Sequence, residues 1–187
     1  AGEGLSYTPG EKNFRFYHLM GCHDPYDLDE NMNFSNTSSL EQKTRGEFMT
    51  VMTYIDQLKA LGVYDNTTVV ITADHGNRHE QAYAHPMVLV KPRNYHAAFS
   101  QVDTPVQFMQ FPATLASQFM SDYSAYGESY FDVTEGEYPD RYLMVHEPLL
   151  DHCDEIPKVY DQTSNVVKFL FHGNVDDNNY EIAGSYK

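Results

Sequence analysis

The sequence has little positive charge. Its 187 residues include 12 Lys and Arg against 27 Asp and Glu, which gives a formal net charge of -15. A surface of this kind repels nucleic acid and anionic membranes unless a local basic patch or a bound cation reverses its sign. We therefore expect no nucleic-acid partner, and the charge alone does not identify a substrate.

Long apolar runs are also missing. No run approaches the roughly 18 residues of a transmembrane helix, and no charged and then apolar signal segment opens the chain. We therefore expect any targeting or membrane-spanning segment of the protein to lie outside this sequence. The cysteines are only two, Cys22 and Cys153, and they are either free thiols or one long-range bridge. Hydrophobic residues still make up 41%, enough for the core of one domain.

The first third of the chain predicts a strand followed by a long helix. Residues 14–20 are rich in aromatic side chains, which is typical of a strand. After a polar loop over 27–39, Ser38 and Glu41 predict a capping box at the start of the helix, and Gly62 predicts its end. Apolar residues at steps of three and four predict one packed face, formed by Phe48, Val51, Met52, Ile55 and Leu58.

Two short strands, over residues 67–72 and 87–90, are predicted after the helix. Their apolar residues are continuous rather than alternating, which favours a parallel sheet with helices on its faces, and in such sheets ligands collect at the carboxyl ends of the strands. Residues 111–119 predict a further short helix, with Pro112 in its first turn. The expected class is therefore α/β.

Beyond about residue 123 the sequence is rich in Tyr, Gly, Asp and short β-prone runs. We expect antiparallel strands there, at the edge of the sheet or in a small subdomain. The expected organisation is an α/β portion over residues 1–122 and a β-rich extension over 123–187 that packs on the same domain.

The strand over 67–72 stops abruptly at polar residues. Asp74 and His75 place a carboxylate next to an imidazole, two ligands that suit Zn²⁺ or Mn²⁺, and Gly76 lets the backbone turn away without a side chain that would block the site. The triplet by itself is more often an ordinary strand-to-loop turn, because such turns favour polar residues and glycine.

The neighbouring motifs favour the functional interpretation. "GCHDPYD", the long amphipathic helix, "LKALGVYDNTTVVITADHGN", "HPMVLVKPRN" and "FPATLAS" follow one another over about residues 14–119. In this order and spacing they resemble the C-terminal half of the sulfatase-like branch of the alkaline phosphatase superfamily. Within that branch the chain looks most like the extracellular phosphoglycerol transferases related to lipoteichoic acid synthase.

This resemblance implies roles for three residues. Asp74 and His75 match the family's metal-binding pair, which implies a divalent cofactor: Mn, Zn, Mg or Ca. His23 in "HDPY" matches the histidine that contacts the transferred phosphate or sulfate group. The implied substrate is an anionic phosphate or sulfate ester, either free or lipid-linked. The family's reaction uses a metal-activated Thr, Ser or formylglycine, and an acceptor alcohol or water then resolves the covalent intermediate.

The chain also departs from the family pattern. In the family the nucleophile and the first acidic metal ligand lie well upstream of the His-x-Pro-Tyr segment, whereas here only 22 residues precede His23. Ser6 and Thr8 are among them, but in a polar tail with no strand before it. We therefore expect half of a catalytic domain, without turnover of its own.

Three functions stay open for the parent protein. Phosphoglycerol-type transfer in the cell envelope is preferred, with a parent anchored to the membrane through segments absent here. A sulfatase that hydrolyses sulfate esters is the second, and a non-catalytic domain that binds envelope components is the third. Other polar candidates have ordinary structural explanations: His18 as a core or interface residue and Cys22 as a semi-buried small residue. His79 and His85 could touch substrate, and Arg78 and Lys91 could hold an anionic one, but such residues are more often solvated surface groups.

Overall fold

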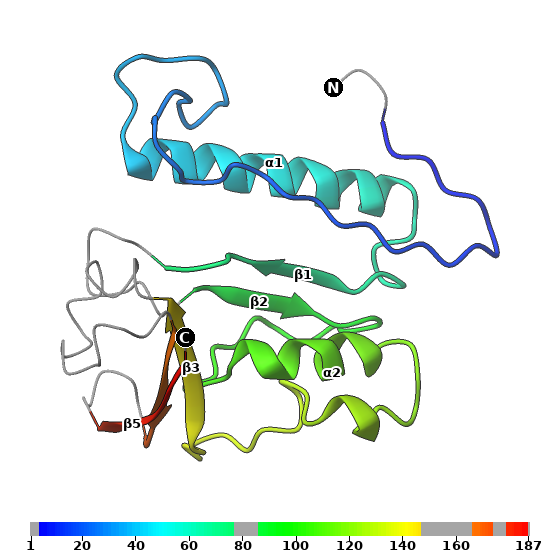
Figure 1. Cartoon of the computed structure of the whole chain (residues 1–187). Coiled ribbons are helices and arrows are strands. Elements are labelled where there is room, and N and C mark those ends of the chain that lie inside the picture. Colours follow the sequence, from blue (N-terminus) through cyan, green and yellow to red (C-terminus); the bar gives the residue numbers. More distant parts are fainter. Residues whose placement is uncertain (1–3, 77–85, 147–165, 174–178, 187) are drawn as a thin grey trace. The chain divides into compact units, whose positions relative to one another are not determined.

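The computed structural model describes residues 4–76, 86–146, 166–173 and 179–186 (Figure 1). The chain divides into two compact units, Ala1–Thr67 and Thr68–Lys187, and each is described by itself. The predicted domain boundary near residue 122 stays a prediction. Within the second unit, Gln110 Nε2 donates to Glu128 Oε2 over 2.7 Å, and this hydrogen bond spans that position.

The first unit is built on helix α1, Leu40–Ala60. A capping box starts it, as expected, but one residue later than predicted: the Gln42 N–H donates to Ser39 Oγ over 3.2 Å, and the Ser39 N–H donates to Gln42 Oε1 over 3.1 Å. The sequence fits both registers, because Ser38 and Ser39 each precede an acid or amide by three residues. Glu41 instead accepts a 2.6 Å hydrogen bond from Arg45 on the helix surface.

The end of α1 confirms the role predicted for Gly62. Its φ is +68°, a left-handed conformation that costs glycine little. The Gly62 N–H donates to the Lys59 carbonyl over 2.9 Å, and the Val63 N–H donates to the Leu58 carbonyl over 3.0 Å. This pair of hydrogen bonds is a Schellman motif, and it satisfies carbonyls that the helix leaves without intrahelical donors.

The N-terminal segment follows α1 backwards, from the end of the helix towards its start (Figure 1). The Leu5 N–H donates to Gln57 Oε1 over 2.8 Å, the rings of Tyr17 and Tyr54 meet edge to face at 5.2 Å, and Lys43 binds the loop that follows. These contacts use a different face of the helix from the predicted apolar one. On the predicted face Leu58 is buried, Val51 and Ile55 are half-buried, and Phe48 and Met52 are exposed.

The strand predicted over residues 14–20 was wrong. The segment has no strand structure, and Phe14, Phe16 and Met20 are 67%, 79% and 73% exposed. A strand needs a hydrogen-bonded neighbour. The described part of the first unit offers only an isolated bridge between Leu28 and Phe34. Aromatic composition by itself therefore did not make a strand.

The second unit begins with the two predicted strands, β1 (Val69–Thr72) and β2 (Val88–Lys91). Their positions are confirmed, but the parallel sheet expected for them is not present. The strands run antiparallel, with Val69 opposite Lys91 and Thr72 opposite Val88. The expectation was wrong because a continuous apolar run reports burial on both faces of a strand and carries no information about the direction of its neighbour.

A short helical segment follows β2. The 3-10 helix η1, Phe108–Gln110, leads into α2, Phe111–Ala116, where Pro112 stands in the first turn as predicted. Thr114 is buried and joins α2 to the chain beyond η2 (Ser124–Tyr126). Its Oγ1 donates to the Gln110 carbonyl and accepts from the Tyr130 N–H, both over 2.8 Å.

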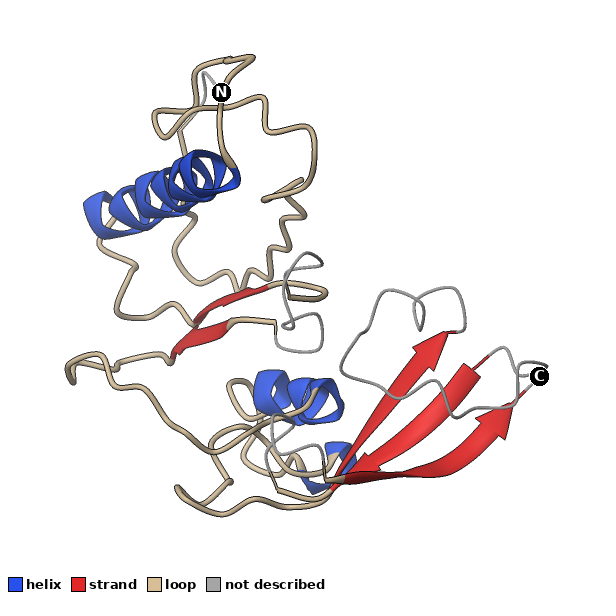
Figure 2. Ribbon diagram, turned by 90° about the vertical axis from the view of Figure 1, so that its left-hand side faces the viewer, coloured by secondary structure: helices blue, strands red, loops and turns tan. Residues whose placement is uncertain are grey.

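The predicted antiparallel tail is confirmed where the structure describes it. Strands β3 (Arg141–His146), β4 (Val166–Phe171) and β5 (Tyr180–Tyr186) form a sheet in the order β3-β4-β5, drawn in red in Figure 2. The central strand alternates, and its buried side chains are Val167, Phe169 and Phe171. Residues 147–165, 174–178 and 187 of this tail lie outside the described residues.

The chain is therefore α/β in the broad sense, with a long helix, short helical segments and small antiparallel sheets. Every strand pair within the described ranges is antiparallel. In the same ranges, no helix has both the length and the apolar content needed to span a bilayer.

Candidate functional site

Asp74 and His75 lie just beyond the end of β1, as predicted. The Asp74 side chain is 85% exposed and that of His75 is 25% exposed. Asp74 Oδ1 accepts from the His75 N–H over 3.1 Å, which fixes the carboxylate near the chain turn. His75 Nδ1 lies 2.7 Å from the Gly76 carbonyl oxygen. A proton on Nδ1 makes this hydrogen bond and presents Nε2 as the ligand nitrogen.

The two side chains have a separation that suits a shared cation. His75 Nε2 lies 3.8 Å from Asp74 Oδ2. Nitrogen and oxygen ligands bind Zn²⁺ at about 2.0–2.2 Å, so two ligands of one ion lie at most roughly 4.3 Å apart. Asp74 and His75 therefore fit the divalent metal that the sequence predicts.

Two ligands leave a coordination shell incomplete, since zinc takes about four. Within the described ranges, no group of three or more His, Cys, Asp or Glu side chains is arranged to hold a metal ion. The loop after Gly76 carries His79, His85 and Arg78, and all three lie outside the described residues.

Lys91 and Asp74 lie at opposite ends of the β1–β2 pair. The antiparallel register places Lys91 opposite Val69, at the start of β1, whereas Asp74 follows the end of that strand. The strand from Val69 to Thr72 already spans roughly 10 Å, and Asp74 lies beyond its end. In the parallel sheet expected from the sequence, Lys91 and Asp74 would have followed the same edge. The antiparallel pairing removes Lys91 from the anion-binding candidates.

His23 lies in the first unit, in the loop between the N-terminal segment and α1. Its side chain is exposed, and its Nδ1 lies 2.5 Å from the Asp24 carbonyl oxygen. The ring is therefore held through Nδ1 by the backbone of the next residue, and Nε2 lies on the opposite side of the ring. His23 and the pair Asp74–His75 belong to different units, and the described contacts bring together only Asp74 and His75.

A buried lysine holds the His23 loop. Lys43, on the first turns of α1, is 4% exposed. Its Nζ donates to the carbonyl oxygens of His23 and Pro25, both over 2.9 Å, and to Asp27 Oδ1 over 3.1 Å. The hydrogen bond from Lys43 lowers the pKa of the Asp27 carboxyl below its usual range, against an opposing contribution from desolvation.

The next turn of the same loop is organised by Asp29. Its Oδ1 accepts from the backbone N–H groups of Asn31 and Asn33 over 2.9 and 2.8 Å. The backbone hydrogen bond from Asn33 is the largest cause of a lowered pKa for the Asp29 carboxyl. The carbonyl of Asp29 approaches α1 at Gly46, where an added Cβ would lie only 2.6 Å from that oxygen.

Sequence reasoning missed Lys43 and Gly46. In an amphipathic helix, a lysine is typical of the exposed surface and a glycine lowers helix stability, so neither indicates a structural role. Their roles become visible only from the path of the loop.

Two other expectations also change. His18 is exposed rather than packed, and Cys22 is exposed, with its Sγ 3.0 Å from the hydroxyl of Thr44. Cys153 lies outside the described residues.

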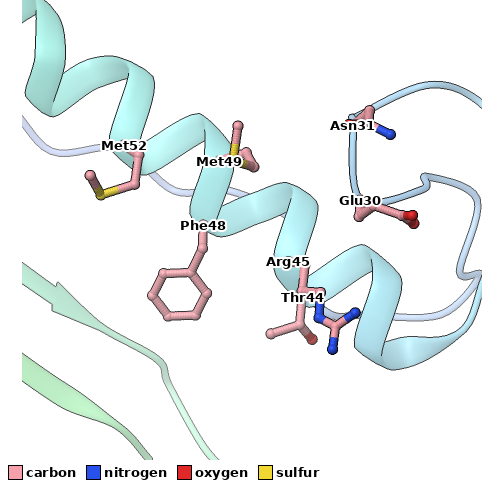
Figure 3. Close-up of a pocket in the computed structure, with 7 residues that line it drawn as sticks. All are labelled: Glu30, Asn31, Thr44, Arg45, Phe48, Met49 and Met52. Carbon is pink, nitrogen blue, oxygen red and sulfur yellow. The ribbon is translucent and has the colours of Figure 1, made fainter.

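An apolar pocket of about 450 Å³ lies beside α1 (Figure 3). Phe48, Met49 and Met52 supply most of its apolar lining, and its remaining lining residues are Glu30, Asn31, Thr44 and Arg45. None of the predicted metal or substrate residues lines it, and Arg45 is paired with Glu41. The pocket therefore adds no residue to the candidate metal and substrate sites.

Comparison with known families identifies the class of protein. The model of the sulfatase family matches residues 3–121, a range that includes His23, α1, β1 and the pair Asp74–His75. The chain is thus a sulfatase-like domain of the alkaline phosphatase superfamily, whose members are hydrolases or transferases that act on esters and generally depend on a divalent metal.

The match covers well over half of the chain, and the chain belongs to the sulfatase family. A search of curated proteins and a search of solved structures each found no match.

Proposed function

We propose that this chain is part of the catalytic domain of a metal-dependent phosphotransferase that acts on cell-envelope polymers. The reaction moves a phosphoglycerol-like group from a lipid donor to an acceptor hydroxyl, outside the cytoplasm. The observation that carries the proposal is the pair Asp74–His75 after β1, with a 3.8 Å separation that suits one shared cation. Membership of the sulfatase family supports the ester chemistry.

Asp74 and His75 would hold the cation, and the candidates are Mn²⁺, Zn²⁺, Mg²⁺ and Ca²⁺. A bound divalent ion of this kind polarises an ester oxygen and lowers the pKa of a hydroxyl nucleophile. The chain's own contribution is to orient the two ligands. The 3.1 Å hydrogen bond to Asp74 and the 2.7 Å contact of His75 Nδ1 serve that purpose.

His23 would contact the anionic group of the substrate. Its ring is exposed, and the contact of Nδ1 with the Asp24 carbonyl orients it. In the imidazolium form Nε2–H donates a charge-assisted hydrogen bond to a phosphate oxygen and offsets part of its negative charge. Because the chain carries a formal charge of -15, a local cationic donor matters for binding an anion.

The nucleophile is proposed to come from polypeptide outside this sequence. Ser6 and Thr8 are the Ser and Thr hydroxyl groups that precede His23, and both are exposed in the segment that runs along α1. No carboxylate or imidazole activates either one in the described contacts. The membrane anchor of the parent protein is likewise proposed to lie outside this sequence.

Hydrolysis of sulfate esters is the second candidate, and the sulfatase family match favours it. Sulfate and phosphate esters present similar tetrahedral anions, so the same metal pair and the same histidine serve both. The difference lies in the acceptor, which is water in a sulfatase and a polymer hydroxyl in the transferase.

The test uses the complete protein that contains this chain. It is supplied with Mn²⁺ and assayed with a fluorescent phosphatidylglycerol and with an aryl sulfate. We expect release of diacylglycerol from the lipid, abolished in Asp74→Ala and in His75→Ala. Asp140→Ala is the matched control, because Asp140 forms the other described Asp–His pair, with His172 at 2.7 Å.

Three outcomes separate the candidates. Lipid turnover without sulfate release supports the proposal. Sulfate release alone establishes the sulfatase. Failure of a folded protein to turn over either substrate overturns both enzyme functions and favours a domain that binds envelope components.

A further inference from the structure

Lys43 is an unusual residue in this fold. Lysine is almost never fully buried unless its charge is paired. Lys43 is 4% exposed, and its ammonium group makes three hydrogen bonds, which uses all of its donors. Within the first unit, Lys43 is therefore a buried structural residue and not a solvated surface charge.

The three acceptors belong to alternate residues of one loop: His23, Pro25 and Asp27. The loop bends around the ammonium group and has little regular structure of its own. Its backbone hydrogen bonds here are from the His23 N–H to the Met20 carbonyl over 3.3 Å, from the Asp27 N–H to the Pro25 carbonyl over 3.0 Å, and from the Ser35 N–H to the Asp27 carbonyl over 2.9 Å, so the stretch is tied to the rest of the loop only at Asp27. Between these points, the carbonyls of His23 and Pro25 are both held by Lys43.

A second anchor holds the other half of the loop. The Asp29 carbonyl approaches α1 at Gly46, one turn after Lys43, and the Asp29 carboxylate binds the backbone of Asn31 and Asn33. The loop is thus fixed to one face of a regular helix at two successive turns. Fixing a loop on a rigid element reduces the entropy lost when a side chain on that loop binds its ligand.

We propose that Lys43 is a positioning residue for His23. It acts through the backbone, because its ammonium group holds the carbonyl of His23 itself, and the ring then leaves the loop in one direction. This inference rests on the proposed function, in which the His23 ring contacts the anionic group of the ester. Lys43 is not itself a ligand of that group, since its donors are all used and Asp27 neutralises its charge.

The test uses the complete protein that contains this chain, with inorganic phosphate as the probe. Phosphate binding is followed through the ring resonances of His23 in proton–carbon NMR spectra. Replacement of a residue that orients a metal-binding side chain typically costs about 10–100-fold in affinity, and we take the lower end of this range for a side chain that binds an anion. We expect Lys43→Met to weaken phosphate binding at His23 by about tenfold or more, and to speed hydrogen exchange at the amides of residues 23–27.

Lys59→Met is the matched control. Lys59 lies on the same helix, is exposed and pairs with Asp56 at 3.3 Å, so its loss removes the same charge without touching the loop. We expect it to leave phosphate binding at His23 unchanged. Equal weakening in both variants would mean that net charge explains the effect, and it would overturn the proposal. Unchanged phosphate affinity and exchange in a folded Lys43→Met would overturn it as well.

A second variant and the hydrogen-exchange readout cover the cases in which Lys43→Met does not fold or His23 does not respond to phosphate. If Lys43→Met loses its helical signal, Asp27→Ala replaces it, because this change removes one acceptor and leaves α1 intact. Weaker phosphate binding and faster exchange over residues 23–27 support the proposal, and no change in either overturns it. If the wild-type ring of His23 does not respond to phosphate, the proposed substrate contact fails, and hydrogen exchange still decides whether Lys43 holds the loop.

Discussion

Replacement of Gly46 by alanine tests whether the loop of residues 23–33 is fixed to α1. Two effects of opposite sign compete. In a helix interior alanine is favoured over glycine by about 1 kcal/mol. Against this, the new Cβ would lie 2.6 Å from the Asp29 carbonyl oxygen and 2.9 Å from Met32 Sδ. The methionine side chain can turn away, but the carbonyl belongs to a turn that the Asp29 carboxylate and backbone hold.

Forcing extra atoms into a packed contact typically costs about 1–3 kcal/mol. After subtraction of the gain in helix propensity, we expect Gly46→Ala to lower the free energy of unfolding by about 1 kcal/mol. The assay is urea unfolding followed by far-UV circular dichroism, with the midpoints compared at equal slope. Thr53→Ala, an exposed position on the same helix, is the control and should change stability by at most about 0.5 kcal/mol. A Gly46→Ala variant more stable than the wild type by about 1 kcal/mol would refute the close approach of the loop.

Two further predictions concern the sheet and the acid stability of the loop. Phe169→Ala, at a fully buried position of β4, should lower the free energy of unfolding by about 3–5 kcal/mol in the same assay. Met144→Ala, 61% exposed on β3, should leave it nearly unchanged, and equal effects would contradict the assigned core. The Asp29 carboxyl, whose pKa is lowered chiefly by the Asn33 backbone, should titrate below the unfolded value of about 3.9 in carbon NMR. Because the folded pKa is the lower one, this contribution to stability is present above about pH 4 and is lost as the pH falls through the folded pKa, and a value at or above 3.9 would contradict the turn.

Features encoded over a few neighbouring residues were predictable from the sequence. The apolar period and Gly62 predicted α1 and its end, because a left-handed residue after the last helical turn favours glycine. Pro112 predicted the start of α2 for a similar reason. The junction of Asp74 and His75 with the end of a strand was also predictable, since it needs only a short apolar run followed by polar residues.

Features that depend on a distant partner were not predictable. Residues 14–20 have strand-like composition, but a strand forms only where a neighbour supplies hydrogen bonds. The direction of β2 relative to β1 is decided by the path of the chain between them, which the strand residues do not encode. In a parallel pair, Lys91 would have followed the same sheet edge as Asp74, and the antiparallel pair places it opposite Val69 instead. The roles of Lys43 and Gly46 could not be predicted from neighbouring residues, because both depend on contacts with a loop that lies earlier in the chain.

The central claim is that Asp74 and His75 are ligands of one divalent cation, and a manganese titration tests it most directly. Mn²⁺ broadens the NMR signals of nuclei close to it, and the ring of His172, already paired with Asp140, is the internal control. We predict selective broadening of the His75 ring, lost in Asp74→Ala and retained in Asp140→Ala. With only two ligands described, the affinity should be weaker than micromolar.

Equal broadening of His75 and His172, or selective broadening that survives in Asp74→Ala, would contradict the assignment of the metal pair. Submicromolar binding that Asp74→Ala abolishes would confirm the pair but contradict the expectation that the remaining ligands lie outside this sequence.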